Sequence, residues 1–151
     1  MKLAEALQER ADLNRRIQLL QGRLSSNAVV QEGERPPEDP QELLKELDGC
    51  IGRLERLIGD INLTNSRTEL EGETMTQMLA RRDALKLRLS AYRDLAYSAS
   101  QLARRGTRSE IKLLSTVDVK AVQKHADALA QELRLLDNRI QAANWTTELL
   151  S

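Results

Sequence analysis

Residues Pro40–Ser66, PQELLKELDGCIGRLERLIGDINLTNS, decide the fold of this chain. Aliphatic residues recur along this stretch in alternating steps of three and four, the heptad spacing of a helix that packs against another helix. Asp39 suits the capping position and Pro40 the first helical position, so we expect a helix over residues 40–66. We predict that its buried seam consists of Leu44, Leu47, Ile51, Leu54, Ile58, Ile61 and Asn65.

The same spacing predicts three further helices, over residues 2–24, 75–103 and 118–144. Thr74 can cap the third helix, with Gln77 reaching back to complete a capping box. Four amphipathic, coiled-coil-like helices of similar length predict a mainly α protein. We therefore expect one domain over residues 1–151, an antiparallel bundle of four helices.

Two short segments between the helices have strand-like sequences. Adjacent valines favour a strand over residues 28–31, and alternating polarity favours another over 109–116. A strand needs a partner for its backbone groups, so we predict that these two segments pair, within one subunit or between subunits. The result is a minor two-stranded β element at one end of the bundle.

Two surfaces of the predicted bundle favour self-association. The helix over residues 75–103 has a second apolar face, which indicates packing on both sides. The helix over residues 40–66 has three glycines off its seam, which suit either a solvated face or the close approach of another helix. We expect a homo-oligomer, a dimer or larger. The two surfaces consist of Ala80, Ala84, Leu87 and Ala91, and of Gly49, Gly52 and Gly59.

Composition excludes several classes of protein. Lys plus Arg equals Asp plus Glu at 23 each, and aromatic residues are 2% of the chain, so we expect no nucleic-acid partner. The lone Cys50 cannot form an internal disulfide. Charged residues interrupt the N-terminal apolar stretch, and no apolar run approaches the ~20 residues of a membrane-spanning helix. We expect a cytoplasmic protein.

Antiparallel order brings polar residues from several helices to one end of the predicted bundle. Two interpretations remain open. Buried amides and a buried arginine could form a polar plug that fixes the helix register. Alternatively, the cluster could bind a small polar or anionic ligand, with arginine as the charge and tryptophan as a wall. The candidate residues are Asn62, Asn65, Arg81, Arg82, Asp83, Asn144 and Trp145.

Motifs for catalysis, metals and cofactors are absent from the sequence. There is no glycine-rich phosphate loop, no Cys-x-x-Cys, no His-Glu-x-x-His and no Gly-x-Ser-x-Gly. His125 is the single histidine, so the two Glu-x-x-His repeats of a di-iron bundle cannot occur. We expect no enzyme activity, no catalytic residues, no bound metal and no cofactor.

Seven stretches, together spanning nearly the whole chain, carry a resemblance to a known family: Met1–Leu7, Val30–Gly33, Ile61–Ser66, Ala80–Asp83, Arg108–Lys112, Ser115–Val119 and Ile140–Trp145. Through them the chain resembles the septicolysin family of small, essentially uncharacterised bacterial proteins. Leu63 departs from the basic residue that this family often has there. The family name implies a membrane-active or pore-forming protein.

Three functional hypotheses follow from these observations. The first is a self-associating helical protein that acts by protein–protein interaction or scaffolding. The second is a septicolysin-like protein that acts on membranes, and only this one includes a membrane partner. The third is a small-ligand-binding bundle that uses the polar cluster.

Overall fold

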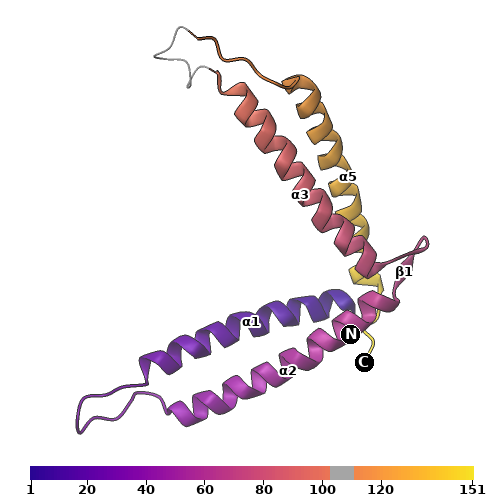
Figure 1. The fold of residues 1–151 in the computed structure, drawn as a ribbon. Helices are drawn as coiled ribbons and strands as arrows, with labels where there is room; N and C mark the ends of the chain where they lie inside the picture. Colours follow the sequence, from indigo (N-terminus) through magenta and orange to yellow (C-terminus); the bar gives the residue numbers. More distant parts are fainter. Residues whose placement is uncertain (103–110) are drawn as a thin grey trace. The chain divides into compact units, whose positions relative to one another are not determined.

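The computed structural model describes residues 1–102 and 111–151. The protein is mainly α, with four helices packed pairwise and a small two-stranded antiparallel β element (Figure 1), which confirms the predicted fold class. The contacts form two compact units: a first unit of Met1–Leu70 with Ala143–Ser151, and a second unit of Glu71–Ala142. The elements are α1 (Leu3–Ser26), α2 (Pro40–Arg67), β1 (Glu69–Leu70), β2 (Glu73–Thr74), α3 (Met75–Ser100) and α5 (Val119–Thr146).

The helix bounds agree closely with the sequence-based ones. α1, α2 and α5 each end one or two residues beyond the predicted position, and α3 ends at Ser100. The predicted end of the third helix, residue 103, lies outside the described residues. The single domain over residues 1–151 stays a prediction, and each unit is described separately below.

The β element lies elsewhere than predicted. Residues 28–31 are in a loop, and residues 111–116 form no strand, so both predicted strands are wrong there; residues 109–110 lie outside the described part. The observed strands instead flank a two-residue turn at Glu71 and Gly72, with φ of 53° and 81°. Positive φ at both positions is the geometry of a tight hairpin. Strands that are next to each other in sequence pair at a small entropic cost of loop closure. The two predicted segments are far apart in sequence, so their pairing would cost more.

The core of the first unit lies between α1 and α2, and the C-terminal segment completes it. Leu149, beyond the end of α5, packs against this core. The Leu3 amide donates a hydrogen bond to the Thr147 carbonyl (2.9 Å), and the Leu149 amide donates to the Met1 carbonyl (2.8 Å). Residues 147–151 therefore belong to the folded unit. The central buried residues are Leu3, Ala6, Leu57 and Ile61.

The seam of α2 is rotated from the predicted one. Leu47, Leu54 and Ile61 are common to two rows with the same three–four spacing, and periodicity alone cannot choose between them. In the structure the seam runs through Leu43, Cys50, Leu57 and Thr64. The prediction is therefore wrong for Leu44, Ile51 and Ile58, which are 41%, 45% and 40% exposed.

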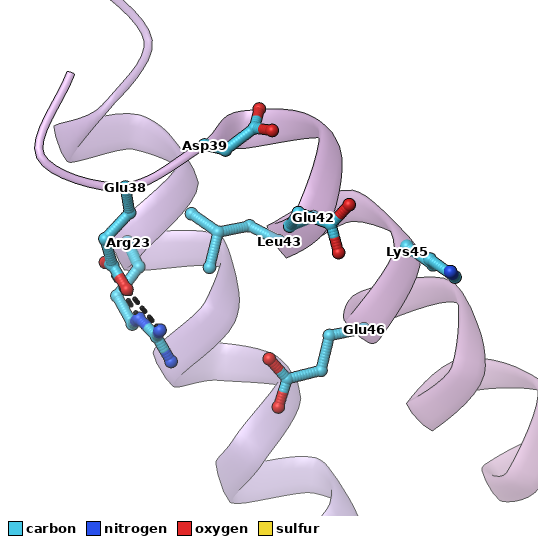
Figure 2. A pocket seen from close by; sticks show the side chains of 7 residues that line it. All are labelled: Arg23, Glu38, Asp39, Glu42, Leu43, Lys45 and Glu46. Carbon is cyan, nitrogen blue, oxygen red and sulfur yellow. Dashed lines mark hydrogen bonds and ion pairs between the residues drawn. The ribbon is translucent and has the colours of Figure 1, made fainter. Parts of the chain in front are cut away.

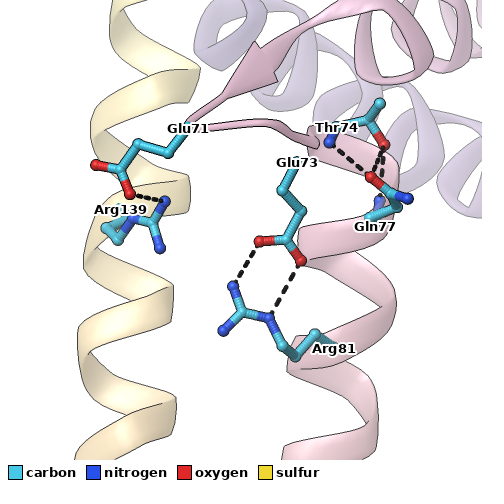
Figure 3. A network of polar contacts seen from close by, with 6 residues as sticks. All are labelled: Glu71, Glu73, Thr74, Gln77, Arg81 and Arg139. Atoms are coloured by element: carbon cyan, nitrogen blue, oxygen red, sulfur yellow. Dashed lines mark hydrogen bonds and ion pairs between the residues drawn. The ribbon is translucent and has the colours of Figure 1, made fainter.

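The second unit is a pair formed by α3 and α5. The Tyr92 ring on α3 stacks on the His125 ring on α5, with centroids 4.3 Å apart. The predicted capping box is confirmed. The backbone N–H of Gln77 donates to Thr74 Oγ1 (3.1 Å), and the backbone N–H of Thr74 donates to Gln77 Oε1 (2.9 Å) (Figure 3). The buried residues of the pair are Met75, Met78, Leu85, Leu89 and Ala96 on α3, and Ala126, Leu129, Leu136 and Ile140 on α5.

Candidate functional site

Ion pairs between α1 and α2 close one flank of the first unit. Arg53 donates two hydrogen bonds to the Glu9 carboxylate, at 2.6 and 2.8 Å. One heptad along, Arg16 pairs with Glu46. Each pair is seven residues from the other on both helices, in opposite directions, as an antiparallel heptad register requires. The Arg53 hydrogen bonds lower the pKa of the Glu9 carboxyl, which is only partly offset by desolvation.

The Glu9–Arg53 pair gives a testable pH dependence. The folded Glu9 carboxyl has a pKa below its ordinary value of 4.5, so below that pH the unfolded chain binds more protons than the folded one. The ion pair therefore stabilises the fold above pH 4.5, and this stabilisation is lost as the pH falls through the folded pKa. Glu9→Gln is expected to lower the free energy of unfolding at pH 7 by up to about 1 kcal/mol and to flatten its acid dependence.

Urea unfolding between pH 7 and pH 3, followed by circular dichroism, measures this effect. Arg53→Gln should flatten the acid dependence similarly, because it leaves Glu9 without its guanidinium partner. If the free energy of unfolding of both variants falls with pH as steeply as that of the unsubstituted protein, the Glu9–Arg53 pair is not the source of the acid dependence.

The opposite flank of the α2 seam is apolar and open. Leu44, Ile51 and Ile58 follow one another at seven-residue intervals there, each with about two fifths of its surface exposed. We call these three residues the α2 row. Heptad geometry places them on the side of the seam away from Glu46 and Arg53. The described chain closes one flank with ion pairs and leaves a continuous aliphatic row on the other.

The α2 glycines provide no packing site within the chain. A Cβ atom added at Gly49, Gly52 or Gly59 would meet no atom within 4 Å. This agrees with the solvated-face interpretation for the described chain. The α2 row is thus the surface of this helix that presents large apolar side chains to solvent.

The structure places four of the predicted polar-cluster residues in the first unit. Asn62 and Trp145 are exposed, Asn65 is half-buried, and Asn144 is buried at 7% exposure. No hydrogen bond joins any two of these four among the described residues. Thr64, which we did not single out, is instead the buried polar end of the α2 seam.

Thr64 joins α2 to the C-terminal segment. Its hydroxyl donates to the Asp60 carbonyl (2.7 Å) and accepts a hydrogen bond from the Leu150 amide (2.9 Å). The sequence signal that could have identified Thr64 is its heptad position, seven residues after Leu57. Thr64 is thus the buried polar residue at the end of the α2 seam, and it contacts the C-terminal segment.

The other three predicted cluster residues lie on α3 in the second unit. Arg81 donates two hydrogen bonds to the Glu73 carboxylate of β2, at 3.2 and 2.7 Å (Figure 3). Arg82 pairs with Asp137 at 3.4 Å, and its buried Nε atom has no partner among the described residues. Asp83 is exposed. Both arginine charges therefore have a carboxylate partner within this unit. That the seven residues form one cluster stays a prediction.

A charged network beside the hairpin was not predicted. Arg139 of α5 donates to Glu71 in the turn (3.1 Å), next to the Glu73–Arg81 pair (Figure 3). Gly72 was the sequence signal for this turn, because glycine readily adopts the positive φ that this position of a two-residue hairpin turn requires. These ion pairs connect both ends of the turn to helices of the second unit.

An open pocket lies between the end of α1 and the start of α2 (Figure 2). Its volume is about 670 Å³. Arg23 donates to Glu38 at this pocket, and its hydrogen bonds lower the pKa of the Glu38 carboxyl. Asn27 orders the adjoining loop by accepting a hydrogen bond from the Glu38 amide (2.9 Å). The pocket is lined by Arg23, Glu38, Asp39, Glu42, Leu43, Lys45 and Glu46.

The pocket contains carboxylates, yet it has no geometry for metal binding. In residues 1–102 and 111–151, no three His, Cys, Asp or Glu side chains are arranged so that they could hold a metal ion. Within the same residues, none of the helices combines the length and apolarity needed to cross a membrane.

Comparisons with known proteins agree with this description. A family model described as a family of unknown function (DUF6847) matches residues 10–149. The chain is also similar to a functionally unknown conserved protein from Corynebacterium diphtheriae, known from a crystal structure. The two are 44% identical, the match covers 99% of each chain, and the TM-score is 0.95. No curated protein matches the chain.

These matches show that the chain has a bacterial relative, and they do not support the name septicolysin. Neither carries a described activity. With a family model matching nearly its full length, the chain belongs to DUF6847, a family of unknown function.

Proposed function

We propose that this protein is a self-associating helical protein that acts through protein–protein contacts, with the α2 row as its contact surface. The observation that supports this proposal is the exposure of Leu44, Ile51 and Ile58 at 41%, 45% and 40% in one continuous line. Single exposed aliphatic residues are ordinary on protein surfaces, whereas a line of them on one helix face is typical of a docking surface.

The energetics of the row support a contact of moderate strength. Burying the remaining exposed area of each side chain contributes about 1 kcal/mol. Three such residues on one partner, matched by a similar surface on the other, suit a reversible association.

A substitution within the row tests the proposal. Ile51→Asp is expected to raise the dissociation constant for self-association at least tenfold, because it places a charge in the middle of the apolar contact. Light scattering coupled to size exclusion, over a dilution series from about 100 μM, measures the mass. Circular dichroism should show unchanged helix content, because Ile51 is 45% exposed in the single chain.

Leu19→Asp is the matched control. Leu19 is 68% exposed on α1 and stands apart from the α2 row, so its substitution should leave the mass unchanged. A monomeric unsubstituted protein at 100 μM would refute the proposal. Equal effects of the two substitutions would also refute it.

A further inference from the structure

The α2 row has an acidic border. Asp48 and Glu55 each follow one residue of the row by four positions and precede the next by three, so they lie along one side of it. Both are exposed, and neither forms an ion pair within the described residues. On its other side the row adjoins the buried seam. A partner surface would therefore be apolar, with positive charge along one edge.

The outward face of α3 in the second unit has these properties. Leu87 is 74% exposed there, and Ala84 and Ala91 lie beside it at positions that permit close approach. Arg88 follows Ala84 by four positions and precedes Ala91 by three, and Arg81 precedes Ala84 by three. The basic border thus lies on the same side of its apolar face as the acidic border of α2.

Arg88 has an available charge. It is exposed and forms no ion pair within the described residues, whereas Arg81 binds Glu73 (Figure 3). The uncompensated charges Asp48 and Arg88 therefore have opposite sign and equivalent positions beside two exposed apolar faces. Such charge complementarity contributes more to the specificity of binding than to the binding affinity itself.

We propose that the α2 row of one copy packs antiparallel on the α3 face (Ala84, Leu87 and Ala91) of a second copy, with Asp48 opposite Arg88. This inference depends on the proposed function, because it names the partner of the same row. In an antiparallel helix pair, equivalent flanks meet, as the ion pairs between α1 and α2 illustrate. The acidic border of α2 then faces the basic border of α3.

One register satisfies all these contacts. With Asp48 opposite Arg88, the seven-residue repeat on both helices brings Glu55 opposite Arg81. Ile51 then lies within one residue of the position opposite Ala84. Alanine at the facing position lets a branched side chain approach the other helix closely. The contact joins two different surfaces, so it gives a dimer when made reciprocally and a larger assembly when continued.

Pairing of α2 with a second α2 is less favourable. An antiparallel pair centred on Ile51 would bring Asp48 of one helix against Glu55 of the other. Equivalent flanks meet in such a pair, so like charges would face each other twice. The α3 face replaces these repulsions with attractions.

Charge reversal tests the assignment. Asp48→Arg and Arg88→Asp are each expected to raise the dissociation constant about tenfold, measured by sedimentation equilibrium at moderate salt. The chain with both substitutions should associate within about threefold of the unsubstituted protein, because the pair is restored in reversed polarity. An equimolar mixture of the two single variants should associate more tightly than either alone.

Arg93→Asp is the control, because Arg93 is exposed on α3 and lies away from the Ala84–Ala91 side. It should leave the dissociation constant unchanged. The inference is overturned if the double variant associates no more tightly than the single variants. If Ile51→Asp dissociates the protein while the charge pair has no effect, the row binds another surface of the second copy and the proposed function survives. A monomeric unsubstituted protein overturns both.

Discussion

Leu57→Ala is expected to lower the free energy of unfolding of the first unit by about 2–5 kcal/mol. Leu57 is fully buried, at 0% exposure, in the core formed with Leu3, Ala6 and Ile61. Truncation removes its transfer free energy and leaves a cavity that a pair of helices can fill only partly. This position also marks where the α2 seam runs.

Ile58→Ala is the matched control. It removes the same number of carbon atoms from the next residue, which is 40% exposed, and should cost about 1 kcal/mol or less. Urea unfolding followed by fluorescence reports on this unit, because Trp145 is the only tryptophan and belongs to it. Measurement at low protein concentration separates folding from self-association. Equal losses for the two variants would mean that the seam passes through Ile58 after all.

Removal of residues 147–151 is expected to destabilise the first unit by about 3–5 kcal/mol. The deletion removes the packing of Leu149 against the core and two hydrogen bonds between the termini. It also removes the Leu150 amide that donates to Thr64. Each bond contributes about 1 kcal/mol and the buried leucine about 2 kcal/mol.

Leu150→Ser tests whether residues 147–151 stabilise the unit through specific contacts or only through their apolar side chains. The Leu150 side chain is 38% exposed and its amide is unchanged by this substitution, so the loss should stay below about 1 kcal/mol. The readout is again Trp145 fluorescence in urea. A truncated chain as stable as the full one would show that residues 147–151 contribute nothing to the core.

The polar cluster could be predicted from sequence only as a set of candidates. The cluster depends on antiparallel order to bring residues of three helices together, and the seven residues divide between the two units. Arg81 and Arg82 were singled out as members of this cluster, and in the structure each pairs with a carboxylate of the second unit. Their carboxylate partners, Glu73 and Asp137, could not be read from spacing, because one lies in the hairpin and the other on a distant helix.

The α2 row shows a second limit of the sequence. Leu44, Ile51 and Ile58 were identified as part of one apolar pattern, yet they were expected to be buried. Hydropathy records that a residue is apolar, and it does not record whether a second helix covers it. Within the first unit α1 packs against α2, and the ion pairs of Glu9 and Arg16 lie on the flank opposite the α2 row.

The sequence by itself determined the helices, because caps and three–four spacing are local signals that depend on the chain within a few residues. Tertiary structure alone decided the rotation of α2 and the inclusion of residues 147–151 in the core. Both depend on contacts between residues far apart in sequence, and the apolar stretch of α2 is wide enough for two seams. The row that α1 leaves uncovered is the surface that we propose as the contact with a second copy of the chain.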